Sequence, residues 1–247
     1  MTGYDAIYLS PHLDDAVLSC GGQIHRFVTA GQRVLVVTFT TQVPRELSPG
    51  AEELHQRWGL SAEEVISARC REDAEACEVL GVDYLHVDEL DAIYRMHPTT
   101  GEALYPSARQ IFEAPAPDDE GHIDVLVRRL RELPPAARIC APLGVGNHVD
   151  HVFLRRAAHQ IWQDRLEYYE DYPYVHRFLA LWKTIGLAPD WTPRVWPLTE
   201  ENVAAKCDSI RCYTSQVPAL FRSEERMEDR VWAYANRFGG ERLWWLS

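Results

Sequence analysis

Short apolar runs alternate with helical segments along most of this chain, and this alternation limits the folds that it can adopt. The apolar runs have the length and composition of buried strands. They cover residues 6–9, 33–40, 82–87, 138–142 and 166–170. Strands that alternate with helices predict right-handed crossovers and a mostly parallel sheet flanked by helices. We therefore expect an α/β fold.

Helix start and stop signals place the segments between these strands. Helices are expected over residues 21–30, 61–80, 123–133 and 149–164. The second has the clearest boundaries, because Ser61 and Glu64 have the spacing of a capping box and Gly81 follows the last turn. Residues 42–59 are polar and contain two prolines, so we expect a surface loop with one helical turn.

Two further segments have no place in the strand–helix alternation. Residues 96–121 are rich in Pro, Gly and Asp and are expected to form an irregular excursion, which could cover a nearby site as a lid. The segment after residue 175 is rich in tryptophan and carries helical stretches near residues 200–213 and 223–237. We expect this C-terminal Trp-rich extension to pack on the same domain, so that residues 1–247 form a single domain.

Composition narrows the classes of partner. The formal net charge is −12, and an acidic surface repels nucleic acid and anionic membranes. No apolar segment approaches the roughly 20 residues of a membrane span, and residues 1–5 lack the basic start of a signal peptide. The six cysteines have no CxxC spacing and are expected to be buried thiols, which fits a reduced, cytoplasmic setting.

Two clusters of histidine and aspartate follow two of the predicted strands. Residues 11–15 read Pro-His-Leu-Asp-Asp directly after the first strand, and residues 148–151 read His-Val-Asp-His after the fourth. Ligands of parallel sheets bind outside the carboxyl ends of the strands. We therefore expect the two clusters to meet at one edge of the sheet.

The clusters hold the ligand types that zinc prefers. His12 and Asp15 lie three residues apart at a strand-to-helix turn and can point into one site. His148 or His151 offers a third ligand. A His/Asp/His set with an open position for water is typical of catalytic zinc, and another divalent metal is compatible with it.

The remaining polar groups suit hydrolysis at such a metal. Zinc lowers the pKa of its water, and Asp14, next to Asp15, is the expected general base. The histidine that does not bind metal could stabilise an oxyanion or protonate a leaving amine. Asp150 could hold that imidazole in one orientation.

Each cluster alone also has a structural interpretation. A histidine at a strand end is often a hydrogen-bonded structural residue, and an Asp-Asp pair often caps a helix. Gly21-Gly22 lacks the GxGxxG spacing, so dinucleotide binding is not expected. Only the two clusters together favour a metal site.

In these two clusters, the chain resembles the LmbE/PIG-L family of zinc-dependent N-acetylglucosaminyl deacetylases. The family carries a Pro/Ala-His-x-Asp-Asp motif and a later His-x-x-His motif, which residues 11–15 and 148–151 match. Weaker likenesses extend the resemblance over roughly residues 4–217, and they are Cys20-Gly21-Gly22, Arg69 with Glu72, Leu80-Gly81, and Lys206 with Ser215-Gln216. The resemblance implies a Rossmann-like α/β domain.

The resemblance also assigns roles to the two clusters. It implies that His12, Asp15 and His151 bind zinc. It implies Asp14 as the general base and His148 as the electrostatic or acid partner.

Substrate contacts are implied less directly. Arg69 would lie near the sugar pocket and contact a hydroxyl or phosphate, with Asp91 as a weaker candidate for a sugar hydroxyl. The alternative for Arg69 is an ion pair with Glu72 on a helix face. Some relatives place a tyrosine where this chain has Gly146, so Asn147 or His148 must supply any oxyanion stabilisation.

The expected activity is the hydrolytic removal of an acyl group from the amino group of an N-acylated amino sugar or glycoconjugate. Acetyl is the first candidate for this acyl group. One alternative is a related amide or conjugate hydrolase with a non-acetyl substrate. Another is a sugar-binding protein without turnover on the same fold. The sequence does not indicate the substrate, the oligomeric state, or the roles of Lys206, Ser215 and Gln216.

Overall fold

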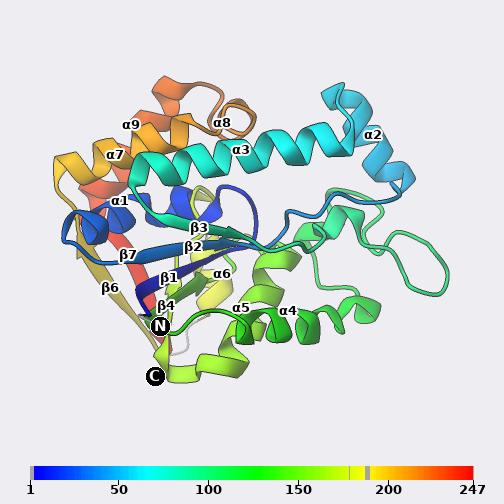
Figure 1. Ribbon diagram of the computed structural model, residues 1–247, viewed down its shortest axis with the longest axis horizontal. Coiled ribbons are helices and arrows are strands. Elements are labelled where there is room, and N and C mark those ends of the chain that lie inside the picture. Colours follow the sequence, from blue (N-terminus) through cyan, green and yellow to red (C-terminus); the bar gives the residue numbers. More distant parts are fainter. Residues whose placement is uncertain (1–2, 178, 187–189, 247) are drawn as a thin grey trace.

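The computed structural model describes residues 3–177, 179–186 and 190–246. Its centre is a seven-stranded sheet with the strand order β3-β2-β1-β4-β5-β7-β6 (Figure 1). The strands are β1 (Tyr4–Ser10), β2 (Val34–Thr38), β3 (Asp83–His86), β4 (Ala136–Pro142), β5 (Leu166–Tyr169), β6 (Trp191–Pro197) and β7 (Gly240–Leu246). The pairings among β1 to β5 are parallel, which confirms the α/β, Rossmann-like prediction.

Helices cover both faces of the sheet. They are α1 (Asp15–Thr29), α2 (Pro49–Trp58), α3 (Ala62–Leu80), α4 (His122–Arg131), α5 (Val149–Trp162), α6 (Ala180–Ile185), α7 (Glu200–Arg211), α8 (Val217–Phe221) and α9 (Glu224–Phe238). Successive residues of a strand point to opposite faces. Ala6 and Tyr8 therefore pack with α1, α3, α7 and α9, whereas Ile7 and Leu9 pack with α4 and α5.

The capping box at Ser61 sets the start of α3. The Ser61 hydroxyl accepts from the amide of Glu64, and the Glu64 carboxylate accepts from the amide of Ser61. Gly81 ends the helix with φ 67°, a left-handed conformation that favours glycine. The predicted boundaries of this helix are confirmed.

One prediction about secondary structure is wrong. Residues 42–59 contain the ten-residue helix α2 instead of one turn. Ser48 caps this helix and Pro49 occupies its first turn, and together they form a helix start signal.

The segment after residue 175 forms the two expected helical stretches, as α7 and α9. It also contributes β6 and β7, an antiparallel pair that extends the sheet beyond β5 and that the sequence did not predict. The description of this segment as a Trp-rich extension is therefore not confirmed.

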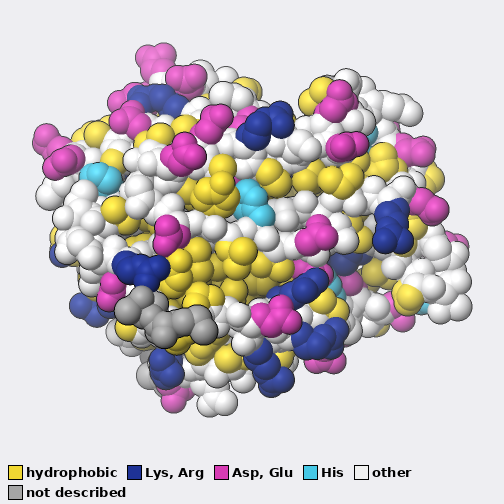
Figure 2. All heavy atoms as spheres, in the orientation of Figure 1, with side chains coloured by type: hydrophobic (Ala, Val, Ile, Leu, Met, Phe, Trp, Pro, Cys, Tyr) yellow, Lys and Arg dark blue, Asp and Glu magenta, His cyan; other side chains and the backbone are white. Residues whose placement is uncertain are grey.

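The edge strand β3 is incompletely covered. Tyr84 and Leu85, successive residues that point to opposite faces of the sheet, are 44% and 41% exposed. Figure 2, in the orientation of Figure 1, shows hydrophobic side chains gathered over the middle of the face turned to the viewer. Within the part of the chain that is described, no helix combines the length and apolar character needed to cross a membrane.

The strand order places the two His/Asp clusters side by side. The chain moves outward from β1 through β2 to β3, and then returns to the other side of β1 to form β4. The crevice between β1 and β4 is therefore the switch point where ligands of open α/β sheets bind. The first cluster follows β1, and the second lies at the start of α5, shortly after β4.

Candidate metal centre and active site

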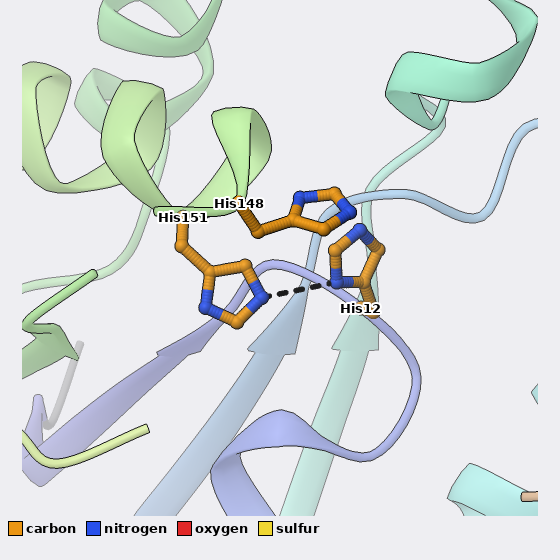
Figure 3. Close-up of side chains that lie close together, drawn as sticks. All are labelled: His12, His148 and His151. Atoms are coloured by element: carbon orange, nitrogen blue, oxygen red, sulfur yellow. Dashed lines mark hydrogen bonds between the residues drawn. The ribbon is translucent and has the colours of Figure 1, made fainter. Parts of the chain in front are cut away.

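The two clusters meet as expected. His12 lies on the turn after β1 and faces His148 and His151 at the first turn of α5 (Figure 3). Its Nδ1 atom lies 3.2 Å from Nε2 of His151. Its ring is edge-on to that of His148, with 4.6 Å between the centroids. The three histidines are buried, and their ring nitrogens lie close enough to hold a metal ion.

Asp15 completes a compact set of ligand atoms. Its Oδ2 lies 3.0 Å from His12 Nδ1 and 3.2 Å from His151 Nε2, so the three atoms form a nearly equilateral triangle. Ligand atoms around one tetrahedral zinc ion, at bond lengths of 2.0–2.2 Å, lie about 3.3 Å apart. The triangle therefore fits zinc in both its size and its nitrogen and oxygen donors.

The charges support this fit. Burial alone would raise the pKa of Asp15, but His151 and His12 outweigh it and hold that pKa well below its usual value. The side chain is therefore a carboxylate, the form that binds metal.

A carboxylate holds the second nitrogen of each of these two imidazoles. His12 Nε2 lies 3.1 Å from Oδ2 of Asp150, and His151 Nδ1 lies 2.6 Å from Oδ1 of Asp171. Such pairing fixes the orientation of a ligating histidine and makes its free nitrogen more basic. Both rings thus direct their other nitrogen into the triangle.

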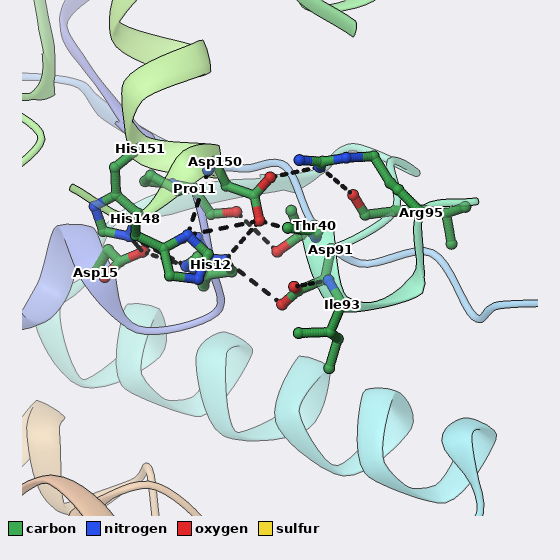
Figure 4. A network of polar contacts seen from close by, with 12 residues as sticks. Pro11, His12, Asp15, Thr40, Asp91, Ile93, Arg95, His148, Asp150 and His151 are labelled. Carbon is green, nitrogen blue, oxygen red and sulfur yellow. Dashed lines mark hydrogen bonds and ion pairs between the residues drawn. The ribbon is translucent and has the colours of Figure 1, made fainter. Parts of the chain in front are cut away.

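Asp150 does not orient the histidine that the sequence suggested. Its carboxylate is 3.8 Å from His148 Nδ1 and closer to His12. The same carboxylate accepts from the amide of Ala92 and pairs with Arg95 (Figure 4). Asp150 therefore connects His12 to the segment after β3, an arrangement that local spacing cannot reveal.

Asp171 is not among the site residues that the sequence predicts. This residue is 1% exposed, and its Oδ2 accepts from the amide of Val145 at 2.7 Å. The available signal was its position, because an acidic residue directly after β5 lies at the same edge of the sheet as both clusters.

His148 caps α5 with its own ring. Its Nδ1 accepts from the amide of Asp150 at 3.3 Å. Burial and the neighbouring His12 hold the pKa of His148 well below its ordinary value. The ring is therefore neutral, and because Nδ1 is an acceptor, the proton lies on Nε2, which can donate to a developing oxyanion.

Asp14 and Arg69 lie beside the triangle of His12, Asp15 and His151, in the wall of the same cavity. Arg69 Nη2 lies 3.8 Å from Oδ2 of Asp14, and Arg69 Nε is buried without a hydrogen-bond partner among the described residues. Burial and the Asp15 carboxylate raise the pKa of Asp14 to about 7. Glu72 instead accepts from Ser215, so the alternative of an Arg69–Glu72 ion pair is not observed.

These groups line a cavity of about 200 Å³. Ile111 and Phe112 of the 96–121 excursion form part of its wall, whereas lid movement stays a prediction. Asp91 also lines it, with Oδ2 3.5 Å from His12 Nε2. Gln216, from the late motif, reaches the same cavity.

Neither Gly146 nor Asn147 lines the active-site cavity, whereas Tyr174 does. The exposed Asn147 donates from Nδ2 to the carbonyl of Glu113 at 2.8 Å, which ties the excursion to the loop before α5. Tyr174 lies directly against Gly146, where a Cβ would come within 3.2 Å of the tyrosine Cβ. Tyr174 lines the cavity, so the turn after β5 provides the aromatic side chain that position 146 lacks.

Lys206 has a structural role. Its Nζ lies 2.7 Å from Oε1 of Glu241 in a buried ion pair. Glu241 also accepts from the amides of Gly22 and Gln23, and thereby joins α1, α7 and β7. A Cβ at Gly21 would meet Lys206 Cγ at 3.0 Å, which explains the paired glycines as a close helix contact.

Comparison with known proteins agrees with this geometry. The family model described as "PIG-L: GlcNAc-PI de-N-acetylase" matches residues 7–162, which include both clusters. The chain belongs to the PIG-L family. Two curated proteins named 2'-N-acetylparomamine deacetylase are similar to this chain.

Both curated relatives are distant. The protein of Niallia circulans is 25% identical over 192 residues, which cover 68% of this chain and 66% of the relative. The protein of Streptomyces fradiae is 28% identical over 173 residues, which cover 68% of this chain and 57% of the relative. The match thus spans less than two thirds of the length of either relative.

A solved structure is similar over nearly the whole chain. The zinc-inhibited form of teicoplanin deacetylase Orf2 superposes with a TM-score of 0.80 at 27% identity, and the match covers 97% of this chain and 96% of that one. The structural similarity therefore extends beyond the family match at residues 7–162 and reaches the part of the chain that forms β6 and β7.

Proposed function

We propose that this PIG-L protein is a zinc-dependent hydrolase that removes an acyl group, acetyl in the first place, from the amino group of an N-acylated amino sugar or glycoconjugate. The observation that carries this proposal is the buried triangle of His12 Nδ1, Asp15 Oδ2 and His151 Nε2, with edges of 3.0 to 3.2 Å. Support also comes from the similar proteins, which are named deacetylases.

The triangle would hold the metal, and the flanking groups would carry the protons. A zinc ion held there would acidify water and polarise an amide carbonyl. Asp14 accepts the proton of the attacking water and returns it to the leaving amine. A pKa raised to about 7 suits this exchange near neutral pH. His148 donates from Nε2 to the oxygen on which negative charge develops.

Arg69 and Asp91 would bind the sugar. Among the residues that the structure describes, Arg69 Nε is a buried donor without a hydrogen-bond partner. An unmet donor of this kind costs roughly 1–3 kcal/mol unless a ligand oxygen fills the position. Asp91 lines the cavity, so its carboxylate can accept a hydrogen bond from a sugar hydroxyl. Its Oδ2 lies 3.5 Å from Nε2 of His12, which places that hydroxyl close to the metal centre. Asn147 contributes indirectly, because it holds the segment that carries Phe112.

Metal content and acetate release together test the proposal. The zinc-loaded enzyme is given an aryl N-acetylglucosaminide, and released acetate and free amine are measured. Wild type is expected to bind one zinc ion per chain and release both products. The double variant His12→Ala/His151→Ala is expected to lose both zinc and activity.

His159→Ala is the matched control. His159 lies on the same helix as His151, and its ring pairs with the hydroxyl of Tyr168. This variant should keep zinc and turnover. Unchanged zinc content in the double variant would overturn the metal assignment. Zinc binding without release of any acyl group from amino-sugar substrates would overturn the enzymatic assignment.

A further inference from the structure

The active-site cavity adjoins a second, larger hollow. The second cavity has a volume of about 640 Å³ and shares Pro173, Tyr174 and Leu220 with the wall of the first. A substrate group that extends past Tyr174 from the metal centre can therefore reach this hollow. The lining of the second cavity thus indicates which chemistry the enzyme accepts beyond the reacting sugar.

Arginines dominate that lining. Arg177, Arg230 and Arg237 line the second cavity, together with His176. We refer to the three arginines as the arginine rim. Arg230 and Arg237 lie seven residues apart, so they project from one face of α9. Among the described residues, no aspartate or glutamate lines this cavity.

The charge of the rim is not neutralised by the protein. Other arginines of this chain pair with carboxylates, as Arg242 does with Glu170 at 2.7 Å. Within the described parts of the chain, no carboxylate forms an ion pair with any rim arginine. Burial, and after it the positive charge of Arg230, Arg237 and Lys206, lowers the pKa of His176, in agreement with an excess of positive charge around this cavity. This concentration is unusual in a chain with a net charge of −12.

Arg177 connects the rim to the catalytic site. Its guanidinium lies 4.8 Å from the ring centroid of Tyr174 and 5.6 Å from that of Phe112, and both rings line the active-site cavity. Arg177 also lines a third cavity with Arg155 and Lys183, again without a carboxylate among the described residues that line it. Positive charge therefore lines both of the cavities that Arg177 borders.

We propose that the natural substrate carries an anionic group, a carboxylate or a phosphate, that lies against the arginine rim while the N-acyl group reaches the metal centre. This inference rests on the proposed function and narrows its substrate class. Planar guanidinium groups bind both anions in a bidentate manner. The same rim repels a cationic aglycone, so it also selects against amine-rich glycosides.

Four matched substrates test this inference. They are aryl N-acetylglucosaminides whose aglycone carries a carboxylate, a phosphate, a neutral carboxamide or an aminomethyl group. With the zinc enzyme, we expect kcat/KM to be about tenfold higher for an anionic aglycone than for the neutral one, chiefly through KM, and lowest for the cationic one. The larger of the two anionic preferences identifies the anion. Salt should reduce the preference, because exposed charges are screened.

Variants of the arginine rim test whether these residues cause the preference for anionic substrates. In Arg230→Gln/Arg237→Gln, the ratio of kcat/KM between the anionic and neutral substrates should fall toward one, and Arg177→Gln should reduce it several-fold. Arg128→Gln, an exposed arginine on α4, is the control and should keep the wild-type ratio. Equal kcat/KM for all four substrates, or a ratio unchanged in the rim variants, overturns this inference alone. Release of acetate from none of them overturns the proposed function and this inference with it.

Discussion

His151 Nδ1 lies 2.6 Å from Oδ1 of Asp171, although the two residues belong to different strand–helix units. The carboxylate also accepts from the amide of Val145 on its other oxygen. Asp171 therefore holds the loop after β4 and the imidazole at the start of α5 in one arrangement. The position of His151, a proposed metal ligand, depends here on a residue outside both sequence motifs.

Asp171→Asn should weaken metal binding. An amide has one acceptor oxygen and cannot satisfy both the His151 ring and the Val145 amide. Loss of such an outer partner typically lowers metal affinity by about 10 to 100-fold. Competition with a zinc chelator measures the change, and Asp164→Asn, exposed just before β5, is the control. Equal zinc affinity in wild type and Asp171→Asn would contradict the role given to Asp171.

Asp14→Asn should abolish proton transfer and spare the metal. The substitution keeps the shape of the side chain and leaves Asp15 in place. We expect deacetylation to fall by about 10²–10⁴-fold, the usual contribution of a general base. Zinc content is measured on the same samples, with Asp124→Asn on α4 as a control for an exposed aspartate. Full activity in Asp14→Asn would show that another group takes the proton.

Lys206→Met should destabilise the protein without changing zinc stoichiometry. The variant leaves the Glu241 carboxylate, which is 2% exposed, without its cation. Breaking a buried ion pair in this way costs about 3–5 kcal/mol. Urea unfolding of the metal-free protein measures the loss, and Lys206→Met/Glu241→Gln should recover part of it. Lost zinc binding in a folded Lys206→Met variant would point to a role in the site instead.

His86 gives a pH dependence to stability. Burial lowers its pKa, but Asp73, whose Oδ2 lies 3.0 Å from the ring, and Cys70 together outweigh this and raise the pKa to about 9, above the ordinary value of 6.5. The folded state therefore holds the proton more tightly than the unfolded chain. This stabilisation, at most about 3 kcal/mol, is complete below pH 6.5 and is lost as the pH rises through 9.

His86→Gln removes that titration. Its free energy of unfolding should lie below that of wild type at pH 6, and the difference should shrink by pH 10. Denaturant unfolding across this range measures both proteins. His25→Gln, a partly buried histidine on α1, controls for the loss of an imidazole. A difference from wild type that stays constant with pH would exclude this role of His86.

Some features follow from local sequence because their causes are local. The capping box of Ser61 and Glu64 and the stop at Gly81 involve residues that are near neighbours, and α3 has the predicted ends. Alternation of strands and helices fixes the direction of the crossovers, and this places both His/Asp motifs at one edge of the sheet. The sequence alone therefore predicted that His12 and His151 would meet.

The tertiary structure decided which groups pair at that edge. Asp150 holds His12 instead of its neighbour His148, and Asp171 holds His151, because side chains from three strand ends pack within hydrogen-bond distance. Local spacing gives no information on such contacts, since they depend on how distant segments pack. The same reason applies to the arginine rim, where the turn after β5 and one face of α9 come together. Motifs thus determined the chemistry of the centre, and packing determined its supports and surroundings.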